Sequence, residues 1–175
     1  LAPVASIKGL DLRLDMDARI TQPVRGGAQD LLGVLMNLVG NAIKFTPAGS
    51  ITIKIELVAD LGPAYRLLFA VRDTGIGIPA EHLPRIFEPF YQVESGANRK
   101  FGGTGLGTSI AKEYVKRMGG ALRVESKPGD GTVFWFEVDM PHAARTVDLI
   151  GQGAAPRIVT GKRVLIADDN RVNLE

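Results

Sequence analysis

The chain has 175 residues, of which 45% are hydrophobic and 23% charged, a composition typical of globular domains and not of disordered segments. Lys and Arg number 21 and Asp and Glu 19, so the formal charge of +2 is too small to indicate a nucleic-acid-binding or membrane-binding surface. With no cysteine and two histidines, the sequence excludes disulfides, thiolate zinc sites, cysteine nucleophiles and histidine metal clusters.

The chain begins with Leu1 rather than Met and carries no signal-peptide pattern. No apolar run reaches the roughly 20 residues that a membrane span needs. We therefore expect an internal piece of a longer protein, with no direct membrane contact in this piece.

The first half of the chain predicts three strands and one long helix. Apolar and charged residues alternate over residues 10–17, which is the period of a half-buried strand. Helical spacing replaces that alternation over residues 28–45, and a Pro and a Gly follow as a stop signal. Two further strands are predicted over residues 51–57 and 65–73, joined by a Gly-Pro turn.

The second half predicts two more helices and a hairpin. In the glycine-rich segment that follows the third strand, Pro79 predicts the first turn of a short helix ending at Phe87. A helix over residues 108–118 ends at two glycines. Strands over residues 122–126 and 132–140 then form a hairpin around a Pro-Gly-Asp-Gly turn.

The amino-acid composition changes near the end of the chain. Residues 143–160 are rich in Ala, Gly and Pro without a clear period, which indicates a linker after a domain of residues 1–142. In the terminal segment, residues 161–175, an apolar strand over residues 163–168 runs into two consecutive aspartates.

Five residues of the long helix fall in one narrow stripe at about 100° per residue, although the other positions are mostly apolar. They are Asp30, Gly33, Asn37, Asn41 and Lys44. A solvated stripe is one interpretation, but such a stripe usually carries Glu, Lys and Arg rather than Asn and Gly. An Asn carbonyl is a hard oxygen ligand that suits Mg²⁺, and the Lys44 ammonium suits a phosphate. The stripe therefore favours a face that another group approaches closely.

Two glycine clusters flank the middle of the chain. Residues 73–77 follow a strand, and residues 102–107 open a helix whose free N–H groups can hold an anion. Flexible turns are the alternative. Because Thr108 follows the second cluster directly, it is no Walker loop, and neither cluster has the dinucleotide G-x-G-x-x-G spacing.

Together these segments resemble the ATP-binding catalytic (HATPase, GHKL-type) domain of bacterial hybrid sensor histidine kinases, in the group that includes gyrase and the heat-shock chaperone ATPases. The resemblance covers roughly residues 6–141 and rests on several boxes in the family order. They are the N box at residues 37–46, the first glycine box at 73–77, the F box at 86–90, the second glycine box at 103–107, and the late Gly-Asp-Gly-Thr at 129–132. This resemblance implies an α+β fold: a two-layer α/β sandwich with a mixed sheet, about three helices on one face, and a flexible ATP lid over residues 78–101.

The resemblance also implies residue roles. Asn41 is the expected Mg²⁺ ligand, Asn37 supports it, and Lys44 lies near the phosphates. Asp73 accepts from the adenine amino group, and Thr132 is the second contact at the base. The other expected nucleotide-binding residues are Gly75, Gly77, Gly103, Thr104, Gly105, Leu106 and Gly107.

The lid is expected to contribute side chains as well. Phe87 and Phe90 are candidate hydrophobic latches or, alternatively, ordinary core anchors. Arg99 or Lys100 is a candidate for stabilising the γ-phosphate, although lid charges are more often merely solvated.

The implied function is to bind ATP·Mg²⁺ and to donate the γ-phosphoryl group to a histidine on a separate dimerisation segment, in a two-component phosphorelay. Hydrolytic relatives carry Glu where this chain has Asn37, so we expect slow hydrolysis and a kinase rather than an ATPase motor. Neither His82 nor His142 has the surroundings of the family's phosphoacceptor histidine. The alternatives are a slow ATPase, a serine-directed protein kinase of the same fold, a nucleotide-binding regulatory module without transfer activity, or a structural scaffold.

Residues 162–170 resemble the first strand and acidic turn of a response-regulator receiver, which would make residues 161–175 the truncated start of such a domain. The expected partners are the dimerisation and histidine-phosphoacceptor helices of the same parent protein, and receiver or phosphotransfer domains, but no nucleic acid. The expected location is cytoplasmic, in a parent protein anchored in the bacterial inner membrane.

Overall fold

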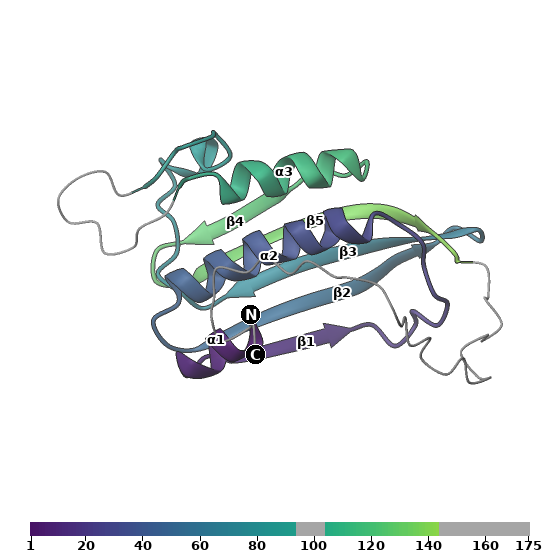
Figure 1. The fold of residues 1–175 in the computed structure, drawn as a ribbon, viewed down its shortest axis with the longest axis horizontal. Coiled ribbons are helices and arrows are strands. Elements are labelled where there is room, and N and C mark those ends of the chain that lie inside the picture. Colours follow the sequence, from purple (N-terminus) through teal and green to yellow (C-terminus); the bar gives the residue numbers. More distant parts are fainter. Residues whose placement is uncertain (94–103, 144–175) are drawn as a thin grey trace, which may run out of the picture. The chain divides into compact units, whose positions relative to one another are not determined.

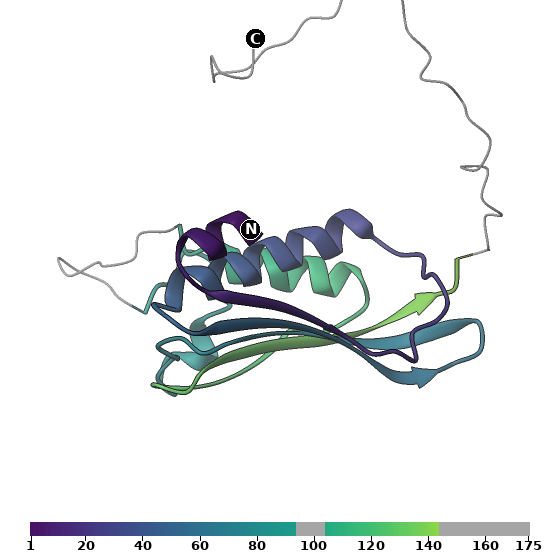
Figure 2. The same ribbon diagram turned by 90° about the horizontal axis from the view of Figure 1, so that it is seen from below.

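The computed structural model describes residues 1–93 and 104–143, in which a five-stranded sheet carries α-helices on one face (Figures 1 and 2). The strands lie in the order β1 (Asp11–Met16), β2 (Ser50–Asp60), β3 (Ala64–Asp73), β5 (Gly131–Pro141) and β4 (Arg123–Lys127). The helices are α1 (Ala2–Ile7), α2 (Ala28–Phe45) and α3 (Gly107–Arg117). β1 and β2 are parallel and the other neighbours antiparallel, so the sheet is mixed and the expected α+β sandwich is confirmed.

The two central strands bury alternate side chains under the helices. Tyr65, Leu67, Phe69 and Val71 of β3 are buried, and the rings of Phe69 and Phe136 stack at a centroid distance of 5.3 Å. The same period of two places the next inward residue of β3, Asp73, directly opposite Thr132 of β5. The alternation that builds the core therefore also carries two polar residues into it, at one end of the sheet.

Most predicted elements are observed within two or three residues of their expected bounds. α2 begins and ends at the expected residues, because helical spacing is strong there and Pro47 and Gly49 lie directly after it. The strand period fails to predict how far β2 extends, since it continues through Asp60 past a register shift at Leu57 and Ala59. α1 is absent from the prediction, because six residues make fewer than two turns.

The predicted short helix from Pro79 to Phe87 is wrong. The segment contains only a 3₁₀ turn, η1 (Leu83–Arg85). The backbone hydrogen bonds of this segment join residues that are three apart. For example, the N–H of His82 donates to the carbonyl of Pro79 at 3.0 Å. Pro84 has no N–H and disfavours helical geometry before it, so an α-helical ladder cannot pass through this segment.

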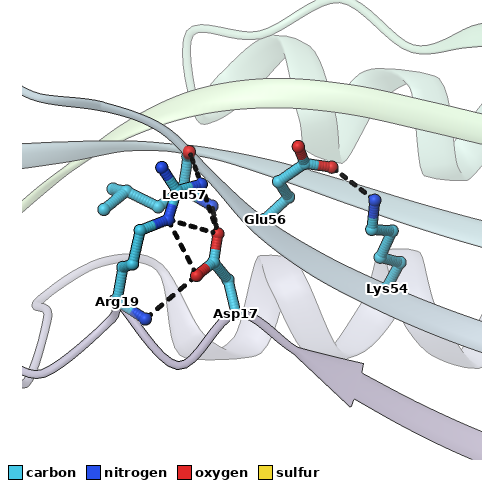
Figure 3. A network of polar contacts seen from close by, with 5 residues as sticks. All are labelled: Asp17, Arg19, Lys54, Glu56 and Leu57. Carbon is cyan, nitrogen blue, oxygen red and sulfur yellow. Dashed lines mark hydrogen bonds and ion pairs between the residues drawn. The ribbon is translucent and has the colours of Figure 1, made fainter.

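A network of polar contacts fastens the end of β1 to β2 (Figure 3). The carboxylate of Asp17 binds the guanidinium of Arg19 through both oxygens and accepts the N–H of Leu57 at 3.2 Å. Arg19 also donates to the Leu57 carbonyl at 3.0 Å. These bonds lower the pKa of Asp17, the Arg19 hydrogen bond most of all.

Several predictions fall outside the described residues. They include Arg99 and Lys100 of the lid, Gly103 of the second glycine box, the linker from residue 144 onward, and the receiver start at residues 161–175. Across residues 1–93 and 104–143, no helix is both long enough and apolar enough to cross a bilayer.

Candidate functional site

Asp73 forms one end of the site, at the last residue of β3. This residue is 7% exposed. Oδ1 accepts the N–H of Gly75 at 2.8 Å and the N–H of Thr132 at 3.2 Å. Burial raises the pKa of Asp73, and the two hydrogen bonds oppose that rise. Both bonds converge on Oδ1, so Oδ2 is the oxygen suited to accept a hydrogen bond from a ligand's amino group.

Ser126 of β4 joins three segments around this aspartate, and the sequence reasoning missed it. Its Oγ accepts the N–H of Ile78, contacts the Oγ1 of Thr132, and donates to the carbonyl of Gly131, each at 2.8 Å. A serine at an inward position of a short strand, next to a Gly-rich turn, is the signal that could have found it. Ser126 ties the residue that follows the first glycine box to the strand that carries Thr132.

Glycines allow the backbone segments around Asp73 to meet. A Cβ at Gly131, where φ is +87°, would lie 2.0 Å from the carbonyl oxygen of Asp73. One at Gly77, where φ is +70°, would lie 2.0 Å from the carbonyl oxygen of Lys127. One at Gly75 would lie 2.4 Å from the Phe45 carbonyl oxygen, at the end of α2. These residues are required for close approach of the main chain, not only for flexibility.

The polar stripe of α2 faces α3 rather than bulk solvent. Asp30 pairs with Arg117 at 3.3 Å, and a Cβ at Gly33 would lie 2.5 Å from the ring of Tyr114. α2 and α3 run antiparallel, so the later part of the stripe meets the first turn of α3 (Figure 1). The N-terminal part of the stripe is therefore helix packing, and only its C-terminal part is available for a ligand.

The C-terminal part of the stripe lies beside Gly107, the first residue of α3. Asn37 donates Nδ2–H to the Gly33 carbonyl at 2.8 Å, and a Cβ at Gly107 would lie 3.3 Å from Asn37 Oδ1 and 3.4 Å from Asn41 Nδ2. Both amides are half-buried. The N-cap residue Leu106 provides no side-chain cap, which leaves the first-turn N–H groups of α3 without a capping side chain.

Hydrogen bonds hold together the lid base, which we define as residues 87–90 and 104–106. The N–H of Phe90 donates to the Gly105 carbonyl at 3.0 Å, and the N–H of Leu106 donates to Thr104 Oγ1 at 3.4 Å. Phe87 packs edge-on against Phe134 with centroids 6.3 Å apart, so it is a core anchor. Phe90 is instead 72% exposed and has a φ of 64°, which a bulky residue rarely adopts.

The structure therefore brings the predicted site residues into two groups. The first group lies at the C-terminal end of β3 and consists of Asp73, Thr132, Gly75 and Gly77. The remaining described ones lie where α2 meets α3 and the lid base: Asn37, Asn41, Lys44, Thr104, Gly105, Leu106 and Gly107. The Lys44 ammonium lies 4.5 Å from the ring centroid of the neighbouring Phe45.

The donor set of this second group fits a metal that arrives with its ligand. Among the described residues, no three His, Cys, Asp or Glu side chains are placed to hold a metal ion by themselves. Mg²⁺ usually takes one or two protein oxygens and completes its shell with phosphates and waters. The amide oxygens of Asn37 and Asn41, beside a helix N-terminus that favours phosphate, match that arrangement.

Comparison with known proteins places the chain in a family. The family model for histidine kinase-, DNA gyrase B-, and HSP90-like ATPases matches residues 26–142. Sensor histidine kinase AruS of Pseudomonas aeruginosa is 40% identical over 100% of this chain and 17% of AruS. Signal transduction histidine-protein kinase BarA of Escherichia coli is 36% identical over 97% of this chain and 18% of BarA. The chain thus spans less than a fifth of the length of these curated relatives.

Two solved structures share the fold. Full-length ShkA in complex with AMPPNP aligns with a TM-score of 0.68 and 34% identity, covering 81% of this chain and 28% of ShkA. The catalytic domain of the histidine kinase ThkA aligns with a TM-score of 0.60 and 29% identity, covering 79% of this chain and 85% of that domain. The chain belongs to the histidine kinase-, DNA gyrase B-, and HSP90-like ATPase family and is a histidine kinase ATP-binding catalytic domain of the kind found in hybrid signalling proteins.

Proposed function

We propose that residues 1–142 bind ATP·Mg²⁺ and donate the γ-phosphoryl group to a histidine on a separate dimerisation segment of the parent protein, in a two-component phosphorelay. The observation that carries this proposal is the division of the site into two chemically different ends. A buried carboxylate with one engaged oxygen suits a base, and amides beside a helix N-terminus suit a metal phosphate.

Each group of residues has a role in binding. Asp73 Oδ2 accepts from the adenine amino group, with Thr132 as the second contact at the base. The N-terminal turn of α3, at the end of the second glycine box, holds the phosphates through its N–H groups and its positive potential. Asn41 Oδ1 ligates Mg²⁺, and Lys44 neutralises phosphate charge. The metal, when bound, supplies further charge neutralisation for phosphoryl transfer.

The side chain at position 37 favours transfer over hydrolysis. An amide cannot take a proton from water at neutral pH, so Asn37 is no general base. Its Nδ2 is engaged with the Gly33 carbonyl, which keeps the amide in place rather than free to position water. We expect slow steady-state ATP hydrolysis by this chain, and rapid turnover by pure material would contradict the kinase assignment.

Calorimetric titration with ATP, with and without Mg²⁺, tests the binding proposal. The wild-type chain should bind ATP more tightly with Mg²⁺, because the metal joins the phosphates to Asn41. Asn41→Ala should lose about tenfold in affinity, roughly 1.4 kcal/mol, in Mg²⁺ and little without it. A wild-type chain that binds no ATP, or an Asn41→Ala variant with an unchanged Mg²⁺ dependence, would refute these roles.

Transfer itself is tested by adding a histidine kinase dimerisation hairpin and labelled ATP. Label that is acid-labile and alkali-stable identifies phosphohistidine, the expected product. Acid-stable label on serine would instead support a serine-directed kinase of this fold. ATP binding without any transfer would leave the chain a regulatory nucleotide-binding module.

We also propose the remaining domain organisation: a linker at residues 143–160 and the truncated start of a receiver domain at residues 161–175. The match to AruS includes these residues, because it covers 100% of the chain. In this proposal the parent is a hybrid protein, and the partners of the domain are its own phosphoacceptor helices and receiver or phosphotransfer domains. The cytoplasm, which supplies the ATP, is the proposed location of this domain, within a parent anchored in the inner membrane.

A further inference from the structure

The C-terminal end of α2 has a partner for each of its last four carbonyl groups, and two of these come from one distant side chain. A helix leaves these carbonyls without partners inside the helix. The carbonyl of Ala42 accepts the N–H of the C-cap residue Thr46 at 3.0 Å. The carbonyl of Phe45 accepts the N–H of Ile76, in the first glycine box, at 3.1 Å.

Lys8 satisfies the other two carbonyls. Its Nζ donates to the carbonyl of Ile43 at 2.5 Å and to that of Lys44 at 3.1 Å. An ammonium at this position also opposes the negative end of the helix dipole of α2. One side chain from outside the helix therefore fixes half of the terminal carbonyls of the N-box helix.

Lys8 is itself held firmly by the turn that ends α1. Gly9 has a φ of 71°, and the N–H of Leu10 donates to the carbonyl of Ala5 at 2.9 Å, which is a helix-ending turn. Ala5 and Leu10 on either side of this turn are buried in the core. α1 lies beside the C-terminal end of α2 in both views (Figures 1 and 2). The backbone that carries Lys8 is thus fixed by its own turn and by the burial of Ala5 and Leu10 in the core.

We propose that Lys8 is a positioning residue for the metal and phosphate end of the site. This inference rests on the proposed ATP·Mg²⁺ function, because it concerns the turn of α2 that carries Asn41 and Lys44. The ammonium of Lys8 holds the backbone of that turn, and the turn sets where the amide oxygen of Asn41 meets the metal. Lys8 also connects α1, the helix before β1, to this end of the site.

The adenine end has different supports. Asp73 is oriented by the N–H groups of Gly75 and Thr132, which belong to the ends of β3 and β5. Loss of the Lys8 ammonium should therefore weaken ligands that carry the metal-bound phosphates and spare ligands that mainly use Asp73. If the Lys8 hydrogen bonds served only stability, their loss would change the affinities for the two kinds of ligand equally.

The test is a calorimetric titration of the 175-residue chain with ATP·Mg²⁺ and, separately, with AMP. Lys8→Met keeps the length and the apolar stem but removes the donors, and Lys8→Arg keeps donors and charge. Lys54→Met is the matched control, since it removes a lysine whose partner is Glu56 at 2.6 Å on the surface of β2. Lys8→Met should lose about tenfold in affinity for ATP·Mg²⁺, as for loss of other outer-shell supports, with AMP affinity unchanged. Lys8→Arg should recover most of it.

Two results would overturn the inference while leaving the proposed function intact: wild-type ATP·Mg²⁺ affinity in Lys8→Met, or an equal loss for both ligands. Failure of the wild-type chain to bind ATP·Mg²⁺ would instead refute the proposed function and the inference with it. If Lys8→Met does not fold, Lys8→Gln, which keeps a short neutral donor, is titrated in its place and judged by the same two criteria.

Discussion

The two ends of the proposed nucleotide site differ in how they are built. At the Asp73 end, the carboxylate is on an inward residue of the sheet, and its partners are backbone N–H groups of Gly75 and Thr132. At the Asn41 end, the amides are half-buried between two helices beside a lid whose residues 94–103 are not described. The first end is part of the core, and the second lies between elements that pack together.

This difference predicts which substitutions should change ligand affinity without changing the stability of the fold. A change at the Asp73 end that moves the backbone or removes a hydrogen-bond partner acts on a group that the fold has already desolvated, so such a change couples stability to base recognition. A change at the Asn41 end acts on side chains that face a ligand space, so affinity should respond more than stability. Substitutions chosen at each end can break or sharpen this contrast.

The largest effect is expected from Gly131→Ala. The new Cβ would lie 2.0 Å from the carbonyl oxygen of Asp73, on a residue whose φ is +87°. The backbone of β5 must move, which we expect to lower the free energy of unfolding by about 3 kcal/mol. Denaturant unfolding measures this loss.

Gly129→Ala is the matched control for that experiment. Gly129 has a φ of +84° but has no atom within 4 Å of the added Cβ. It should cost only the left-handed backbone penalty of about 1–2 kcal/mol. Equal losses in the two variants would show that the contact with Asp73 does not constrain the fold.

Asp73→Asn should be the most damaging change to binding that leaves the fold in place. Asn keeps Oδ1 for the N–H groups of Gly75 and Thr132, but it turns an NH₂ donor toward the amino group of adenine. Affinity for ATP and AMP should fall about 100-fold, or about 3 kcal/mol, as calorimetry would measure. Retained affinity with a folded protein would place the base elsewhere.

Gly107→Ala probes the opposite end with a single methyl group. Its Cβ would lie 3.3 Å from Asn37 Oδ1 and 3.4 Å from Asn41 Nδ2, in the space between α3 and the amides. We expect roughly fivefold weaker ATP·Mg²⁺ binding, about 1 kcal/mol, with stability changed by less than about 0.5 kcal/mol.

The control is Gly40→Ala, also in a helix but with no atom within 4 Å of its Cβ. It should raise stability by about 0.5–1 kcal/mol and leave affinity unchanged. If both alanine variants lose affinity alike, the effect comes from stiffening α2 or α3 and not from filling the ligand space.

The smallest effect is expected from acid. The pKa of Asp73 lies above the ordinary 3.8 because of burial, so protonation should weaken nucleotide binding as the pH falls toward that raised value. The ionised form of Asp17, whose pKa is lowered, contributes stability that is present above 3.8 and lost only at lower pH. Affinity should therefore decline before the fold does, and Asp73→Asn should abolish that decline. Simultaneous loss of binding and fold would argue against it.

Much of the architecture could be predicted from local patterns. The 18 residues of α2, the alternating strands and the late hairpin follow from periodicity and stop signals that need no distant partner. The segment after Pro79 could not, because a first-turn proline predicts a helix there that the interior Pro84 prevents. α1 is too short for its period to be read.

By itself, the sequence determined the residue types and their spacing. It places amides on one face of α2, glycines in the turns next to the strands, and an aspartate at the end of an alternating strand. Tertiary structure alone decided which of these residues come together. Packing against α3 uses Asp30 and Gly33 for helix contact, while strand register places Asp73 opposite Thr132. Ser126 and Lys8 have roles only because distant segments converge on them, and spacing along a chain carries no information about such contacts.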